Sequence, residues 1–153
     1  MNEIKVAIAD DHKIFRKGVI LSMRSYSNIK FVMEADNGEE LLAKIPESAP
    51  DVILCDLKMP VKDGIDTTKL ITKNFPNIRV IILTMYEDER FVGHLMDCGA
   101  AGYLLKSTDP AEIKKAMCSF KLPKRIKGLP TFGKRFLNKM NFIKVGNPGD
   151  KMN

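Results

Sequence analysis

The sequence predicts an α/β protein with a doubly wound, five-stranded parallel sheet. Short apolar segments alternate with segments of helical periodicity from Ile4 to Met117. This alternation is typical of parallel strands joined by helices that cover both faces of a sheet. The segment at residues 51–56 (DVILCD) is apolar on both faces, as expected for a central parallel strand. Right-handed connections between such strands leave few topologies.

The strand-like segments are short and apolar, and they stop at charged or turn-forming residues. β-branched residues are frequent in them, which favours the extended conformation. The predicted strands are Ile4–Ala9, Ile29–Ala35, Asp51–Asp56, Ile78–Thr84 and Ala101–Leu105.

The helical segments lie between and after these strands. They are predicted at Lys13–Arg24, Glu39–Ile45, Ile65–Phe75, Asp88–Cys98 and from Pro110 through Met117 or a little beyond. In the first of them, apolar residues from Ile14 to Met23 recur at helical spacing. We expect Pro46 to stop the second helix. Asp109 is expected to cap the last helix, with Pro110 at its first position.

Polar side chains follow four of the five predicted strands. They are Asp10 and Asp11 after the first strand, Asp56 at the end of the third, Thr84 at the end of the fourth and Lys106 after the fifth. In open parallel sheets the functional site lies outside the carboxyl ends of the strands. We therefore expect these five residues to form one site.

The chemistry of this group favours a bound cation and a phosphoryl group. Three carboxylates this close would raise each other's pKa unless a cation intervenes. With no cluster of Cys or His nearby, oxygen ligands and Mg²⁺ are expected, and His12 alone is not expected to be a metal ligand. Lys106 would pair with phosphoryl oxygens, and the Thr84 hydroxyl would donate a hydrogen bond to them.

Residues 3–117 resemble the receiver domain of bacterial two-component response regulators. They are most similar to the subgroup that usually ends in a LuxR-type helix-turn-helix. The matching segments are Ala9–His12, Leu54–Pro60, Asp63–Gly64, Leu83–Thr84 and Leu105–Ser107, with the phrases LTMYEDE and GAAGYLLK favouring the subgroup.

The resemblance implies a flavodoxin-like sheet with the strand order 2-1-3-4-5. It implies that Asp56 accepts a phosphoryl group from a histidine kinase. Asp10, Asp11, Asp56 and the backbone carbonyl of Lys58 would then hold Mg²⁺, and Lys106 would bridge to the phosphoryl oxygens. Thr84 and Tyr103 would move as a switch. The resemblance further implies a signalling switch rather than an enzyme, one that assists its own phosphotransfer and autodephosphorylation.

The net charge of +6 comes entirely from the end of the chain. Residues 1–117 carry 16 Lys and Arg against 18 Asp and Glu, whereas residues 118–153 carry nine Lys and Arg against Asp150 alone. Pro and Gly interrupt this second part, which argues against a long helix or a regular sheet. We expect residues 1–120 to form the receiver domain and residues 121–153 to form a basic tail.

The tail is shorter than a helix-turn-helix domain, and no three-helix pattern is present in it. Phe132, Phe136, Met140 and Ile143 recur at near-helical spacing among basic residues. This segment would pack on the receiver or on a second copy, fray, or contact nucleic acid or an anionic membrane. We hypothesise that it is not the family's original output region, as after a truncation or a frameshift.

Two functions remain open. The first is a phosphorylation-controlled switch that works through protein contacts, with a homodimer as one arrangement. The second is a transcription regulator whose basic tail touches DNA. The three widely spaced cysteines and the absence of a long apolar segment indicate a cytoplasmic protein that does not cross a membrane.

Overall fold

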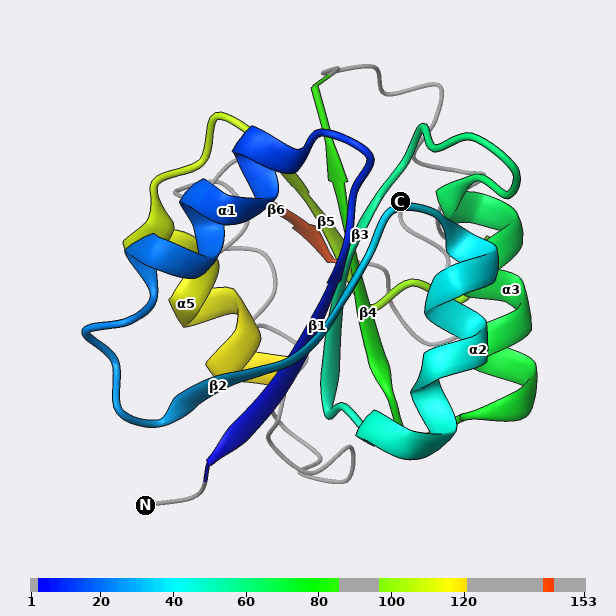
Figure 1. The fold of residues 1–153 in the computed structure, drawn as a ribbon, viewed down its shortest axis with the longest axis horizontal. Coiled ribbons are helices and arrows are strands. Elements are labelled where there is room, and N and C mark those ends of the chain that lie inside the picture. Colours follow the sequence, from blue (N-terminus) through cyan, green and yellow to red (C-terminus); the bar gives the residue numbers. More distant parts are fainter. Residues whose placement is uncertain (1–2, 86–96, 121–141, 145–153) are drawn as a thin grey trace.

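The protein forms one sheet with helices on both faces (Figure 1). This computed structural model describes residues 3–85, 97–120 and 142–144. The strands are β1 Ile4–Ala9, β2 Ile29–Ala35, β3 Val52–Asp56, β4 Arg79–Thr84, β5 Gly102–Leu105 and β6 Phe142–Lys144. The helices are α1 Lys13–Ser22, α2 Gly38–Ser48, α3 Gly64–Asn74 and α5 Pro110–Phe120.

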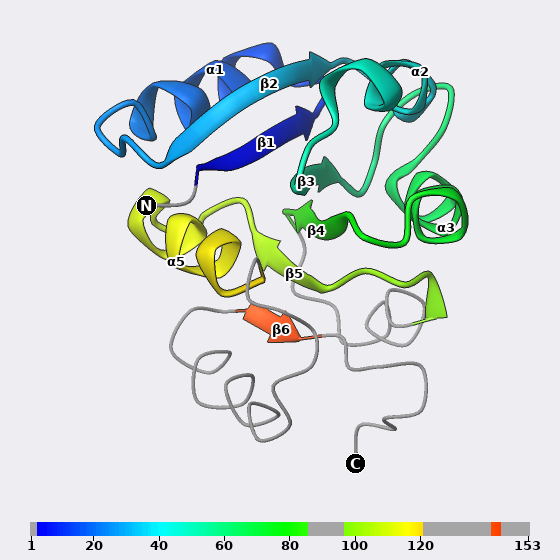
Figure 2. The same cartoon turned by 90° about the horizontal axis from the view of Figure 1, so that it is seen from below.

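The strand order is β2-β1-β3-β4-β5-β6, and the first five of these strands are parallel (Figure 2). The predicted α/β fold and the strand order 2-1-3-4-5 are therefore confirmed. Helices α1 and α5 cover one face of the sheet, and α2 and α3 cover the other (Figure 1). The reversal of direction along the strand order falls between β1 and β3, where open sheets of this kind place their sites.

Two predictions about individual elements are wrong. Pro46 does not stop α2, which continues to Ser48. Ala49 ends the helix instead, with φ of 45° in the left-handed region and its N–H donating to the Ile45 carbonyl at 2.8 Å. The tail was expected to lack regular sheet, yet β6 pairs antiparallel with β5 and sets Ile143 opposite Tyr103. Without β6, strand β5 would expose an unpaired edge.

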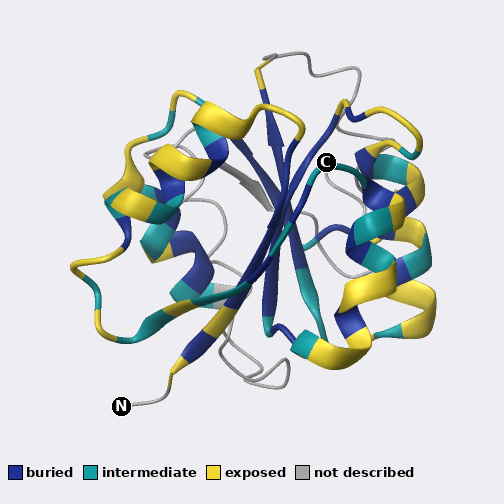
Figure 3. Ribbon diagram, viewed as in Figure 1, coloured by how far each residue is buried: buried dark blue, intermediate teal, exposed yellow. Residues whose placement is uncertain are grey.

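Side chains alternate between two apolar layers, one on each face of the central strands. The central strands are buried, and the helices are exposed on their outer sides (Figure 3). In β3, Ile53 and Cys55 pack toward α2 and α3, whereas Val52 and Leu54 pack toward α1 and α5. All five residues of β3 are buried. Both faces of this strand are thus filled, and its functional side chain, Asp56, lies at its carboxyl end.

Some predictions fall outside the described residues. These are most of the predicted helix Asp88–Cys98 and nearly all of the amphipathic segment from Phe132 to Ile143. Among the helices that the structure describes, none has the length and apolar character needed to cross a membrane.

Candidate functional site

Strand register brings the predicted acids together at the carboxyl edge of the sheet. Ala9 of β1 pairs with Cys55 of β3. The next residue on each strand is an aspartate, so Asp10 and Asp56 follow this pair side by side. Both are buried, at 0% and 4% relative exposure. A parallel register between two strands thus places two carboxylates in a nearly dry environment, where charge is costly without a partner.

Lys106 is the ammonium group that lies between these two carboxylates. Its Nζ is 2.8 Å from Asp10 Oδ2 and 3.3 Å from Asp56 Oδ2, and its side chain is only 8% exposed. It also lies 4.7 Å from the centre of the Phe15 ring, a favourable cation–π distance. The β4–β5 pairing of Thr84 with Leu105 sets Lys106 one residue beyond that pair.

Burial and the neighbouring Asp10 carboxylate raise the pKa of Asp56 to about 7, although the Lys106 ammonium opposes the shift. The physical cause is the low local polarity, which disfavours the charged form of a carboxyl group. One lysine therefore does not fully compensate two buried carboxylates. A carboxyl group with a strongly perturbed pKa at the edge of an α/β sheet is a functional-site candidate.

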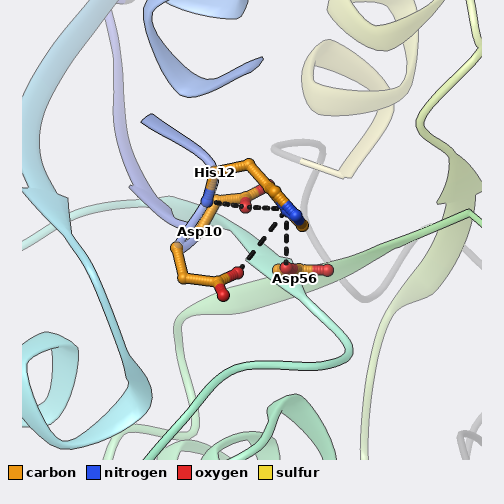
Figure 4. A group of neighbouring side chains, drawn as sticks. Asp10, His12 and Asp56 are labelled. Carbon is orange, nitrogen blue, oxygen red and sulfur yellow. Dashed lines mark hydrogen bonds and ion pairs between the residues drawn. The ribbon is translucent and has the colours of Figure 1, made fainter. Parts of the chain in front are cut away.

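Asp11 and His12 form the outer rim of the pocket. The Asp11 side chain is 36% exposed and that of His12 is 61% exposed. The His12 N–H donates to Asp10 Oδ1 at 2.8 Å, which fixes the Asp10 carboxylate. The His12 ring turns toward the carboxylates of Asp10 and Asp56 (Figure 4). The Asp11 carboxylate lies 3.6 Å from the same ring.

The loop after β3 is held close beneath Asp56. The Gly64 N–H donates to the Leu57 carbonyl at 2.9 Å. A Cβ on Gly64 would lie 2.4 Å from the Asp56 carbonyl oxygen, so only glycine fits at this position. Lys58, whose carbonyl was predicted to contribute to the site, lies in this loop and is exposed.

Thr84 and Tyr103, the predicted switch residues, lie on neighbouring strands. Thr84 is the last residue of β4 and is 3% exposed. Its carbonyl accepts a hydrogen bond from the Lys106 N–H at 2.8 Å, which connects the ends of β4 and β5. Tyr103 in β5 is 5% exposed and belongs to the apolar layer that faces α2 and α3.

The pocket has a donor set that suits Mg²⁺. Ligand atoms of Asp10, Asp11, His12 and Asp56 all lie within 4.8 Å of one another. The buried oxygens Asp10 Oδ2 and Asp56 Oδ2 both face the Lys106 ammonium, which shows that this space attracts a cation. Carboxylate oxygens are the ligands that Mg²⁺ takes in proteins. The residues present therefore fit this ion.

A buried arginine beside the pocket is a feature that the sequence interpretation missed. Arg16 of α1 is 7% exposed. Its Nη1 donates to the backbone carbonyls of Asp10 and Ala35 and to Asp36 Oδ1, while its Nε donates to Glu34 Oε1 at 3.0 Å. Arg16 thus connects the end of β1, where the site begins, to the end of β2.

The fold and this acidic pocket define a receiver domain. The chain matches the response regulator receiver domain family over residues 6–118 and belongs to that family. Receiver domains of this kind are parts of two-component signalling proteins.

Individual relatives agree with this family. The transcriptional regulatory protein LnrK of Bacillus subtilis (strain 168) is 37% identical over 114 residues, which cover 74% of this chain and 52% of LnrK. The signal receiver domain of the response regulator NarL from Mycobacterium tuberculosis aligns with a TM-score of 0.75 and 31% identity, covering 79% of this chain and 98% of that one.

A further structural relative is RcsB from Salmonella enterica serovar Typhimurium, bound to the promoter P1flhDC in the presence of the phosphomimetic BeF3⁻. It aligns with a TM-score of 0.72 and 31% identity, covering 78% of this chain and 61% of RcsB. The chain spans about half the length of the curated relatives it matches.

Proposed function

We propose that this protein is a phosphoacceptor switch that takes a phosphoryl group from a histidine kinase onto Asp56. The observation that carries the proposal is the pairing of two buried aspartates with one buried lysine at the end of the parallel strands. A purely structural ion pair would need only one acid. Here a second carboxylate lies beside the first at the carboxyl edge of the sheet, where open parallel sheets have their functional sites.

In the proposed reaction an oxygen of the Asp56 carboxylate attacks the phosphorus of a phosphohistidine. The bond between phosphorus and the histidine nitrogen breaks, its electron pair stays on the nitrogen, and Asp56 becomes an acyl phosphate. Bound Mg²⁺, held by Asp10, Asp11, Asp56 and the Lys58 carbonyl, would neutralise charge on the phosphoryl oxygens. Asp56 must be ionised to attack, so its raised pKa makes a nearby cation important.

The other pocket residues have distinct roles in this proposal. Lys106 would pair with an oxygen of the phosphoryl group on Asp56. This group would be within reach, because Lys106 Nζ already lies 3.3 Å from the Asp56 carboxylate. The Thr84 hydroxyl would donate to the same group, and Tyr103 would respond to the movement of Thr84. A local change of charge would in this way bias a two-state arrangement of the β4–β5 region.

The test of this site uses acetyl phosphate and Mg²⁺ with the intact chain. We expect the mass to increase by one phosphoryl group, and we expect Asp56→Asn to abolish the increase. Asp66→Asn, an exposed acid on α3, is the matched control and should label like the wild type. Equal labelling of Asp56→Asn and the wild type would refute the assignment of the phosphoacceptor.

Binding of DNA is the second candidate function. It is supported by the nine basic residues against one acid in residues 118–153 and by relatives that regulate transcription. Contacts of Lys and Arg with phosphates weaken steeply as salt rises. Fluorescence anisotropy with labelled duplex DNA should therefore show salt-dependent binding that disappears when residues 121–153 are deleted. Binding that survives the deletion would contradict a role for the tail.

A further inference from the structure

The side chain of His12 does not cap the helix that it precedes. It is the N-cap residue of α1, yet its side chain makes no capping hydrogen bond with the first turn of the helix. The ring instead turns to the carboxylates of the pocket (Figure 4). Nδ1 lies 3.2 Å from Asp10 Oδ1, 3.6 Å from Asp11 Oδ1 and 3.9 Å from Asp56 Oδ2.

With only the Lys106 ammonium as a cation, the contacts of His12 Nδ1 place opposite demands on this nitrogen. Lys106 Nζ lies 3.3 Å from Nδ1 and can only donate, so Nδ1 would have to accept. Asp10 Oδ1, when ionised, can only accept, so Nδ1 would have to donate to it. One nitrogen cannot do both at once. A positive ion between the imidazole and the carboxylates would satisfy an unprotonated Nδ1 and the carboxylate oxygens together.

Two further observations indicate that this space suits a cation. The separations of 3.2–3.9 Å between Nδ1 and the three carboxylate oxygens are those of neighbouring ligands around one small ion, whose bonds are about 2.0–2.2 Å long. Asp10 Oδ2 and Asp56 Oδ2 are also buried, and they already attract one cation, the Lys106 ammonium, at 2.8 Å and 3.3 Å.

We propose that His12 Nδ1 is an additional ligand of this pocket and that the pocket therefore binds a divalent transition-metal cation through three carboxylates and one imidazole. The inference rests on the proposed function, because the same three aspartates hold the cation. An imidazole adds little to the binding of Mg²⁺, which prefers oxygen ligands and keeps several waters. It adds substantially to the binding of cations from Fe²⁺ to Zn²⁺, which accept nitrogen readily.

The discriminating quantity is the change in affinity for two cations when His12 is replaced. We would titrate the intact chain with Mg²⁺ and, separately, with Co²⁺, using calorimetry for both and visible absorption for Co²⁺. Loss of a residue that only orients a metal ligand costs about 10–100-fold in affinity, so loss of a direct ligand should cost at least about tenfold. We expect His12→Phe to lose this factor for Co²⁺, to change the Co²⁺ spectrum, and to bind Mg²⁺ like the wild type.

Two variants make the outcomes distinguishable. His94→Phe removes the only other histidine in the sequence and should leave Co²⁺ binding unchanged. Asp11→Asn should weaken the binding of both cations. If His12→Phe binds Co²⁺ as tightly as His94→Phe does, the imidazole is not a ligand and the inference fails while the carboxylate site stands. If Asp11→Asn binds Mg²⁺ like the wild type, the carboxylate site itself is wrong and both proposals fail.

Discussion

Two groups of three acidic side chains lie at the same edge of the sheet and are neutralised in opposite ways. The first is the pocket of Asp10, Asp11 and Asp56, whose two buried members share the single ammonium of Lys106. The second consists of Glu34, Asp36 and Glu40, at the end of β2 and the start of α2. Backbone pairing of Ala9 with Ala35 places the two groups side by side.

In the second group Arg16, Lys17 and Lys44 together face the three carboxylates, and Glu40 also accepts a backbone N–H. Arg16 binds Glu34 and Asp36, and Lys44 lies 2.7 Å from Glu40 Oε1. The Asp36 N–H donates to Glu40 Oε2 at 3.2 Å. These acids are also a third or more exposed, so ionising them costs little.

The pKa values move in opposite directions for this reason. The hydrogen bond from Arg16 lowers the pKa of Asp36, and the hydrogen bond from Lys44 lowers the pKa of Glu40. Burial raises the pKa of Asp56. In the second group the ionised acids thus stabilise the fold. In the first group the negative charge is only partly neutralised, and strongly shifted pKa values of this kind are typical of functional sites.

Arg16 should give the largest loss of stability of any residue in the comparison. Arg16→Met leaves Glu34 and Asp36 without their main partner and removes the donor to two backbone carbonyls. A buried carbonyl that loses its donor costs about 1–3 kcal/mol, and we expect a loss in that range from urea unfolding, because the Glu34 and Asp36 carboxylates are partly exposed and remain solvated. The matched control is Lys17→Met, because Lys17 also faces Glu34, at 3.5 Å, but is 65% exposed.

Lys17→Met should cost less than about 1 kcal/mol, as exposed ion pairs generally do. Equal losses for the two variants would show that burial of Arg16 is unimportant. The Arg16 variant is also expected to disturb the pocket, since Arg16 holds the Asp10 carbonyl.

In contrast to Arg16→Met, Asp56→Asn should increase the free energy of unfolding at high pH. The pKa of Asp56 is about 7 in the folded protein, above the unfolded value of about 3.9. The protonated form is therefore favoured by folding, and this stability is lost as the pH rises from about 4 through 7. We expect the stability of Asp56→Asn relative to the wild type to grow by about 2 kcal/mol from pH 5 to pH 8, measured in EDTA.

Adding Mg²⁺ at pH 8 provides the control for this effect. A bound cation compensates the ionised carboxylates, so Mg²⁺ should stabilise the wild type and reduce its difference from Asp56→Asn. A difference between the two proteins that does not depend on pH would show that Asp56 is adequately compensated by Lys106 alone.

The pocket could be predicted from sequence because its position follows from topology. Once five parallel strands are recognised, residues after each strand must meet at one edge, and Asp10, Asp56 and Lys106 do so. The orientation of His12 could not be predicted, since an N-cap side chain can turn either to its own helix or to a neighbouring strand.

Arg16 was missed although a signal for it exists. The helical pattern was counted from Ile14, yet Ile14 is 91% exposed. Arg16 is at the start of the buried series that continues through Val19 and Met23. A charged residue in that series needs polar partners. Those of Arg16 are Glu34 on β2 and Asp36 just after it, 18 and 20 residues away in the sequence. Only the tertiary fold identifies them.

Glu40→Gln should have the smallest effect on stability, and it tests the second acidic group, that of Glu34, Asp36 and Glu40. Glu40 pairs with Lys44 one helical turn away, and its side chain is 33% exposed. A pair of this kind contributes about 0.3–0.5 kcal/mol. Glutamine retains an acceptor for the Asp36 N–H, so we expect urea unfolding at pH 7 to show a loss of about 0.5 kcal/mol or less.

The pH dependence of this loss has the opposite sign to that of Asp56. Because the pKa of Glu40 is lowered in the folded protein, its contribution is present above the unfolded value of about 4.3 and is lost as the pH falls through the folded value. Wild type and Glu40→Gln should therefore become equally stable near pH 3. A difference that grows as the pH falls would mean that Glu40, like Asp56, is ionised at a cost, and the contrast between the two acidic groups would not hold.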